Sequence, residues 1–289
     1  AFGEKMVMRI FDPDNAVKDL DALGFAQHDA QRWEALVKRP HGIILVTGPT
    51  GSGKTTTLYA TLKRVATEEV NVSTVEDPIE MIEPSFNQTQ VQPQLDFNFA
   101  EGLRALMRQD PDIIMVGEIR DLETADISIK AAQTGHLVLS TLHTNDAPTT
   151  LTRMRNMGIA PFNIASSVIL ITAQRLARRL CAQCKEPADI PHEALIEAGY
   201  DEAELNGSWV SYKPVGCPAC NNGYKGRVGI YQVMPISEEI QRIILRDGSA
   251  LEIAEQAKAE GVRSLRGSGL HKVKLGLTSL EEVLAVTNE

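Results

Sequence analysis

The chain has 289 residues, enough for two domains, and its 43% hydrophobic and 23% charged residues are typical of a soluble globular protein. Its formal net charge of −9 argues against broad binding of nucleic acid, which depends on basic side chains that neutralise phosphates. No apolar run approaches the roughly 18 residues that a membrane helix needs. We therefore expect membrane association only through partner proteins.

The N-terminal residues predict the end of one domain followed by a linker. Residues 3–11 alternate polar and apolar side chains, which predicts a strand, and 12–25 read as a linker with a short helix. Because the chain starts within this predicted strand, we expect residues 1–11 to be the end of a truncated preceding domain. A helix is predicted over 29–38, with Asp29 as its N-cap.

A glycine-rich string follows a buried apolar strand predicted over 43–46 and precedes a helical pattern over 56–62. Its pattern G-x-x-x-x-G-K-[ST], in this position, is typical of a phosphate-binding loop. The glycines let backbone N–H groups converge on phosphate oxygens, and the start of the helix adds a favourable dipole. Lys54 would reach the terminal phosphates, and the Thr55 hydroxyl would bind Mg²⁺. The predicted nucleotide-binding residues are Gly48, Pro49, Thr50, Gly51, Ser52, Gly53, Lys54, Thr55 and Thr56, together with Glu76 from a later segment.

Further apolar runs predict strands over 71–75, 113–116 and 137–141, separated by helical patterns over 99–109 and 122–134. Strands that alternate with helices predict an α/β fold with a mostly parallel sheet, in which ligands bind at the carboxyl ends of the strands. Several acids and one histidine follow these strand ends, and we expect them to meet at one site: Glu76, Glu80, Glu118 and His143.

Hydrolysis of ATP needs bound Mg²⁺, a group that orients the attacking water, and positive charge near the transition state. Glu118 ends an apolar strand where a Walker B acid lies, so we assign it to the Mg²⁺ and water network, although a glutamate departs from the usual aspartate. Glu76 and Glu80 are both reasonable general bases, and the residues alone do not choose between them. His143 is a better candidate than His136 for contacting the γ-phosphate, because it follows a strand end.

All four cysteines fall into two pairs, Cys181-x-x-Cys184 and Cys217-x-x-Cys220. Four thiolates in two such pairs match a structural zinc site. Disulfides or free thiols are the alternative, and a reducing compartment disfavours disulfides. Because four thiolates leave no open ligand position, we expect Zn²⁺ to pin this excursion of the chain and not to catalyse.

The pattern changes beyond residue 149. One long helix is predicted over 164–179. Shorter helical patterns follow at 238–246, 250–259, 269–274 and 280–286. We predict three parts after the linker: an ATPase core over 26–180, a tetracysteine zinc-binding segment over 181–232 and a small helical domain over 233–289.

Four motifs together resemble the secretion-superfamily ATPases that power type II secretion and type IV pilus assembly, and the resemblance covers essentially the whole chain. They are the Walker A motif at 48–55, an Asp box at 74–80, an atypical Walker B motif over 103–118 and a His box at 135–144. The tetracysteine excursion, with 223–231 and 278–283, is most similar to the pilus extension branch, and the type II secretion branch is the alternative.

The resemblance implies a RecA-like P-loop fold and a homohexameric, ATP-driven motor. It points to Glu80 over Glu76 as the catalytic carboxylate, to Glu118 as a metal ligand and to His143 near the γ-phosphate. It also implies that Arg9, at the end of a preceding N2 domain, reaches ATP on a neighbouring subunit. Such motors act in the cytoplasm at the inner membrane, where a platform protein passes their motion to pilin polymerisation.

Other functions also fit a nucleotide-binding loop. They are a monomeric P-loop kinase or nucleotidase, a DNA-translocating RecA-like motor, and a scaffold that binds ATP without hydrolysing it. We see no motif for the second substrate pocket of a kinase, and the acidic charge balance disfavours DNA.

Overall fold

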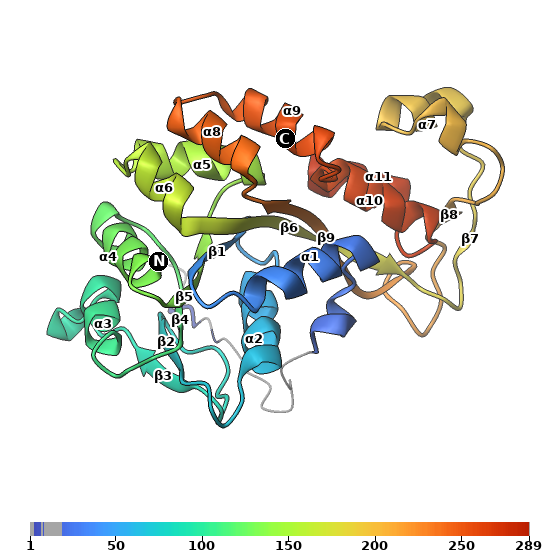
Figure 1. The fold of residues 1–289 in the computed structure, drawn as a ribbon. Coiled ribbons are helices and arrows are strands. Elements are labelled where there is room, and N and C mark those ends of the chain that lie inside the picture. Colours follow the sequence, from blue (N-terminus) through green and yellow to red (C-terminus); the bar gives the residue numbers. More distant parts are fainter. Residues whose placement is uncertain (1–2, 7, 9–18, 289) are drawn as a thin grey trace.

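A computed structural model describes residues 3–6, 8 and 19–288, and in this part the chain folds around a main sheet of seven strands (Figure 1). The strand order is β3-β2-β4-β5-β1-β6-β9. Neighbouring strands from β3 to β6 run parallel, whereas β9 is antiparallel to β6. The mostly parallel α/β sheet is therefore confirmed. The strands are β1 (Gly42–Thr47), β2 (Val72–Glu76), β3 (Asn87–Gln90), β4 (Ile113–Val116), β5 (Leu137–Leu142), β6 (Val168–Leu180) and β9 (Tyr224–Pro235).

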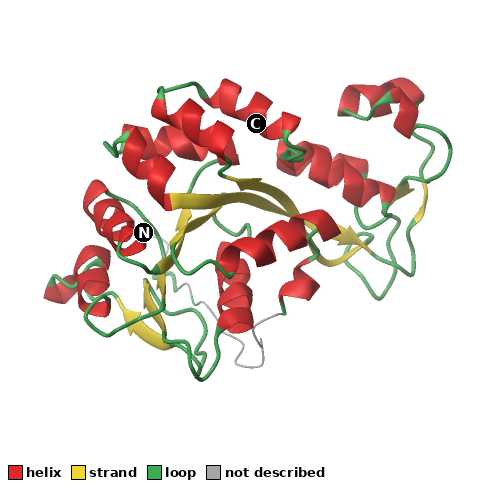
Figure 2. Cartoon of the chain, viewed as in Figure 1, coloured by secondary structure: helices red, strands yellow, loops and turns green. Residues whose placement is uncertain are grey.

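Helices cover both faces of this sheet (Figure 2). One face packs against η1 (Leu20–Leu23), α1 (Gln27–Val37) and α2 (Lys54–Val65). The other face packs against later helices: α3 (Phe99–Leu106), α4 (Leu122–Gln133), α5 (Ala147–Asn156), α6 (Pro161–Ser167), α8 (Glu238–Leu245), α9 (Ala250–Ala259), α10 (Leu265–Lys274) and α11 (Leu280–Thr287). Among the described residues, no helix has both the length and the apolar character needed to cross a membrane.

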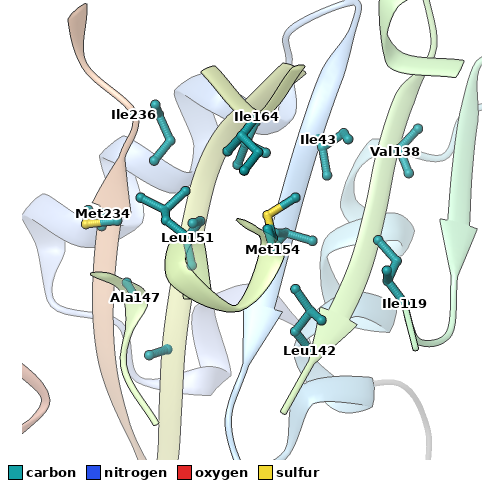
Figure 3. Close-up of a cluster of buried hydrophobic side chains, with 14 of the residues drawn as sticks. Ile43, Ile119, Val138, Leu142, Ala147, Leu151, Met154, Ile164, Met234 and Ile236 are labelled. Carbon is teal, nitrogen blue, oxygen red and sulfur yellow. The ribbon is translucent and has the colours of Figure 1, made fainter. Parts of the chain in front are cut away.

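The central strands are apolar on both sides because each side faces a layer of helices. In β1, Ile43 and Leu45 belong to the core under α3–α6 and α8–α11, whereas Ile44 and Val46 belong to the core under α1 and α2. Figure 3 shows part of the first core, where side chains from the strands meet those of α5 and α6. Each buried aliphatic side chain contributes about 1.5–3 kcal/mol, so both layers fix the position of the strands.

The strand predicted over 3–11 is not seen in its described residues, 3–6 and 8, which have no regular secondary structure. Two further local predictions are wrong. The helix predicted over 164–179 ends at Ser167, and the chain continues as the 13-residue strand β6. The β-branched start of this segment and its pairing with both β1 and β9 override the helix-forming residues near its end. Asp29 is not an N-cap, because α1 begins at Gln27 with Ala26 in the capping position, and Asp29 is buried within the helix.

The four short C-terminal helices are confirmed as α8–α11, and α10 begins at Leu265, four residues earlier than predicted. Their buried side chains belong to the same core cluster as strands β1, β4 and β5. Whether they form a domain of their own stays a prediction.

The cysteine-containing excursion leaves the sheet after β6 and returns at the start of β9 (Figure 1). The segment predicted over 181–232 therefore ends inside β9, which lies in the main sheet. The excursion contains four short elements: β7 (Glu186–Pro187), α7 (His192–Ala198), η3 (Glu202–Glu204) and β8 (Tyr212–Lys213). One further short helix, η2 (Pro93–Leu95), lies in the loop after β3.

Glu282 of α11 ties the C-terminal helices to β6. Its buried carboxylate accepts hydrogen bonds from the backbone N–H of Arg178 at 2.8 Å and from the Arg178 guanidinium at 2.9 and 2.7 Å. The same guanidinium lies 4.2 Å from the centre of the Tyr224 ring on β9. Burial alone would raise the pKa of Glu282, but the hydrogen bonds and charge of Arg178 lower that pKa overall. The carboxylate therefore stays ionised and bonded.

We expect Glu282→Ala to lower the free energy of unfolding by about 1–3 kcal/mol, because the Arg178 backbone N–H and guanidinium lose their acceptor. Urea denaturation measures this loss. Glu281→Ala removes an exposed acid from the preceding position and should change stability by less than about 0.5 kcal/mol. Equal losses in the two variants would contradict the role of Glu282.

Candidate active site

A cleft of about 420 Å³ opens at the carboxyl ends of β1, β2, β4 and β5. Most of the predicted nucleotide site lines it. These residues are Thr50, Gly51, Gly53, Lys54, Thr55, Thr56, Glu76, Glu80, Glu118 and His143. The remaining loop residues Gly48, Pro49 and Ser52 shape the loop from behind through their backbone carbonyls. Arg9 lies outside the described residues, so its predicted role stays a prediction.

The glycine-rich loop turns sharply between β1 and α2. Gly48, Gly51 and Gly53 have φ values of 146°, 79° and 88°, a left-handed region that suits glycine. A Cβ on Gly48 would lie 2.5 Å from the backbone oxygen of Gln174. Because α2 begins at Lys54, its first free N–H groups lie beside the cleft, where an anion is favoured.

Gln174 of β6 holds this loop from below, and the sequence did not reveal it. Its side-chain N–H group donates to the Ser52 carbonyl at 2.7 Å, and its side-chain oxygen accepts from the Thr57 hydroxyl at 2.9 Å. Gln174 is fully buried. It was missed because the segment was predicted as a helix, which would not have placed this side chain under the loop.

His143 lies between Lys54 and Glu118. Its Nδ1 is 3.4 Å from the Lys54 ammonium, and its Nε2 is 3.2 Å from a Glu118 carboxylate oxygen. The sheet order explains the arrangement, since β5 lies between β1 and β4 and therefore delivers His143 between the residues that follow those strands. Lys54 also donates to the carbonyls of Gly48 and Pro49 at 2.8 and 3.0 Å. Burial lowers the pKa of Lys54, and the nearby charge of Glu118 partly offsets this.

Glu118 has a second partner that we did not assign from the sequence. The Arg120 guanidinium donates to Glu118 at 2.8 Å and lies 3.5 Å from Asp77. The side chain of Glu118 is 19% exposed and lines the cleft. Arg120 thus adds a positive charge at the edge of the cleft, which Lys54 and Arg227 also line.

The two acids of the Asp box lie in different environments. Glu76 is buried, and its carboxylate accepts hydrogen bonds from the hydroxyls of Tyr59 and Thr74 at 2.5 and 2.6 Å. Glu80 is exposed, and among the described residues no hydrogen bond or ion pair engages its carboxylate. Glu80 is therefore the acid whose oxygens are available to water in the cleft, and Glu76 is engaged by the protein.

His136 lies at the opposite end of β5 from His143. His136 follows α4, and its Nδ1 donates to the carbonyl of Ala131 in the last turn of that helix at 2.9 Å. It does not line the cleft. This placement agrees with the choice of His143 over His136 as the histidine nearer the predicted nucleotide site.

The four cysteines converge although 32 residues, 185–216, separate the pairs. Their sulfurs all lie within 4.8 Å of one another, with separations of 3.9 Å for Cys181–Cys217, 3.7 Å for Cys184–Cys220 and 3.6 Å for Cys217–Cys220. Disulfides would need about 2.05 Å. A tetrahedral site with Zn–S bonds near 2.3 Å spaces its sulfurs about 3.8 Å apart. The cluster thus has the dimensions of a tetrathiolate metal site.

Comparisons with known proteins cover nearly the whole chain. The family model described as "Type II/IV secretion system protein" matches residues 1–285. A protein of Acinetobacter baylyi named "Type IV pilus assembly ATPase PilB" is 56% identical over 289 residues, which is 100% of this chain and 50% of that protein. "Type II secretion system ATPase E" of Vibrio cholerae is 50% identical over 294 residues, covering 99% of this chain and 56% of that protein. The chain thus spans about half the length of these relatives.

Solved structures agree with the fold. The crystal structure of the pilus retraction motor PilT with bound ADP superposes with a TM-score of 0.70 at 26% identity, covering 97% of this chain and 69% of that one. The ADP belongs to that protein.

We expect Gly48→Ala to lower the free energy of unfolding by roughly 2–4 kcal/mol, because the new methyl group meets the Gln174 backbone in a strained conformation. Gly51→Ala is the matched control, since it has positive φ and nothing within 4 Å of its Cβ. It should lose only about 1–2 kcal/mol. Urea denaturation of both variants measures the difference, and a smaller loss for Gly48→Ala than for Gly51→Ala would contradict the close approach of β6.

Proposed function

The chain belongs to the type II/IV secretion system protein family, and from this membership we propose that it is the catalytic part of an ATP-hydrolysing motor for type IV pilus assembly. The observation that carries the proposal is the row Lys54–His143–Glu118 beside a phosphate-binding loop. The positive charge of Lys54 suits the outer phosphates of a nucleotide, and the carboxylate of Glu118 suits a metal ion bound to them. Relatives named type IV pilus assembly ATPases support the choice of pilin polymerisation as the work performed.

We assign ATP binding to the loop 48–56. The backbone N–H groups of this loop and of the start of α2 would bind the phosphates, with Lys54 neutralising the outermost ones. Thr55 and Glu118 would hold Mg²⁺, which supplies charge neutralisation to the transferring phosphoryl group. Both residues line the cleft. For ATP to enter, Lys54 exchanges its bonds to the Gly48 and Pro49 carbonyls for bonds to phosphate.

Glu80 is the proposed general base. Its free carboxylate faces the cleft and can take a proton from a water that attacks the γ-phosphate. His143, which already contacts Lys54 and Glu118, would register the presence of that phosphate by exchanging one of these partners for it. Arg120 and Arg9 are further sources of positive charge, with Arg9 acting on a neighbouring subunit's ATP.

The assembly proposed is a homohexamer of RecA-like units in the cytoplasm, bound at the inner membrane through a platform protein. The position of β5 between β1 and β4 supports the RecA-like assignment, and the net charge of −9 argues against nucleic acid as a partner. The alternative is a type II secretion ATPase that drives pseudopilus assembly, supported by the relative in Vibrio cholerae. Another RecA-like translocase is a weaker alternative.

Zn²⁺ is the metal proposed for Cys181, Cys184, Cys217 and Cys220. Backbone N–H groups of Gly216 and Cys217 approach the sulfurs of Cys184 and Cys220 at 3.4 and 3.3 Å, which favours thiolates. With four protein ligands the site is structural. It would pin the excursion at the point where the β6–β9 hairpin ends.

We expect Lys54→Ala and Glu80→Gln each to lower steady-state ATP turnover by on the order of 10²-fold or more. Glu80→Gln should still bind ATP with an affinity near that of the wild type, because the phosphate-binding loop is intact. Glu83→Gln is the control, since Glu83 lies on the same loop but does not line the cleft. Wild-type turnover in Glu80→Gln would refute the base assignment. If the wild-type protein binds ATP but does not hydrolyse it, the alternative of a nucleotide-dependent scaffold is favoured over the motor.

Elemental analysis of the purified wild type should give one zinc per chain. Cys217→Ser should lower the zinc content and make the excursion more susceptible to proteolysis, because the loop between the pairs loses its clamp. Zinc-free wild-type protein would overturn the assignment.

A further inference from the structure

A buried polar cluster lies behind the loop that carries Glu80. This loop, residues 77–86, connects β2 to β3 and has no regular secondary structure. The cluster consists of Tyr59 from α2, Glu76 from the end of β2 and Gln88 from β3. Tyr59 is completely buried, and Glu76 is 3% exposed. The cluster therefore connects three elements of the core to one irregular loop.

The contacts of this cluster converge on the carbonyl of Met81, the residue that follows Glu80. The Tyr59 hydroxyl lies 3.1 Å from the Met81 carbonyl and 2.5 Å from a Glu76 oxygen. The Gln88 side-chain N–H group lies 2.9 Å from the same carbonyl and 3.2 Å from the other Glu76 oxygen. Burial, together with the hydrogen bond to Glu76, raises the pKa of Tyr59 and keeps its hydroxyl protonated as a donor.

Gln88 also fixes the loop on the other side of Met81. Its side-chain oxygen accepts from the Glu83 backbone N–H at 2.9 Å. The neighbouring strand residue Gln90 accepts from the Ile79 backbone N–H at 3.2 Å. The backbone on both sides of Glu80 is thus held by side chains of β3 and α2, whereas the Glu80 carboxylate has no such support of its own. These contacts therefore fix the backbone position from which the Glu80 side chain extends.

We propose that Tyr59 and Gln88 are positioning residues for Glu80, with Glu76 as the buried anion that orients them. This inference rests on the proposed function, in which Glu80 is the base. The proposal gives Glu76, the first glutamate of the Asp box, a role distinct from catalysis. Displacing a reacting group by about 1 Å can cost on the order of 10²-fold in rate, so a cluster that fixes the loop backbone affects turnover without touching ATP.

Tyr59→Phe tests the proposal because it keeps the ring that packs 5.6 Å from the Phe86 ring and removes only the hydroxyl. We expect kcat to fall about tenfold or more, with KM for ATP within about twofold of the wild type, because the phosphate-binding loop is unchanged. Tyr200→Phe is the matched control: it removes another buried tyrosine hydroxyl, one that donates to the Leu270 carbonyl at 2.8 Å and does not line the cleft. It should leave kcat unchanged.

Gln88→Leu is the second variant and removes the bonds to Met81 and Glu83 together. As for Tyr59→Phe, we expect kcat to fall about tenfold or more while KM for ATP stays within about twofold of the wild type. In a Glu80→Gln background, Tyr59→Phe should cause no further loss of turnover, since a positioning residue acts only through the group it positions. If Glu80→Gln abolishes turnover while Tyr59→Phe and Gln88→Leu keep the wild-type kcat, the positioning role is refuted. If Glu80→Gln itself keeps wild-type turnover, the base assignment of the proposed function fails instead.

Discussion

The contact of His143 with both Lys54 and Glu118 is the interaction on which the site depends. Each of these residues follows a different strand, and only the parallel alignment of β1, β5 and β4 brings their carboxyl ends to one edge. The hydrogen-bonding distance between neighbouring strands then places the three side chains in a row. A cation, an imidazole and a carboxylate can share protons and exchange partners when a polyanion arrives. The sheet order is thus a functional constraint as well as an architectural one.

The hairpin of β6 and β9 connects this row to the rest of the molecule. Gln174 lies under the phosphate-binding loop, and four residues later Arg178 binds Glu282 of α11. Cys181 follows at the end of the same strand, opposite the return of the chain at Tyr224. A shift of β6 along its axis would therefore act on the loop, the C-terminal helices and the cysteine cluster together. Such continuity suits a protein that converts changes at a phosphate into movement of distant elements.

Much of the site follows from local patterns in the sequence. The phosphate-binding loop, the acids after strand ends and the paired cysteines are each encoded within a few residues, and the parallel topology brings them together. The strand β6 was not predictable in this way, because its conformation depends on β9, which is more than 40 residues later, and on β1. Gln174 and Tyr59 were missed for a related reason. Their roles lie in contacts with residues far along the chain, which no local periodicity reports.

Glu76 and Glu80 illustrate how tertiary burial separates chemically equal residues. The sequence offered both as bases, four positions apart in one motif. In the structure the last residue of β2 remains within the core, where neutral hydroxyl and amide donors must satisfy a buried carboxylate. The Gln88 amide has a further N–H that donates to the Met81 carbonyl at 2.9 Å, and the Tyr59 hydroxyl, whose single proton goes to Glu76, lies 3.1 Å from the same carbonyl. The donors that satisfy the buried Glu76 thus also hold the loop backbone from which the exposed Glu80 extends.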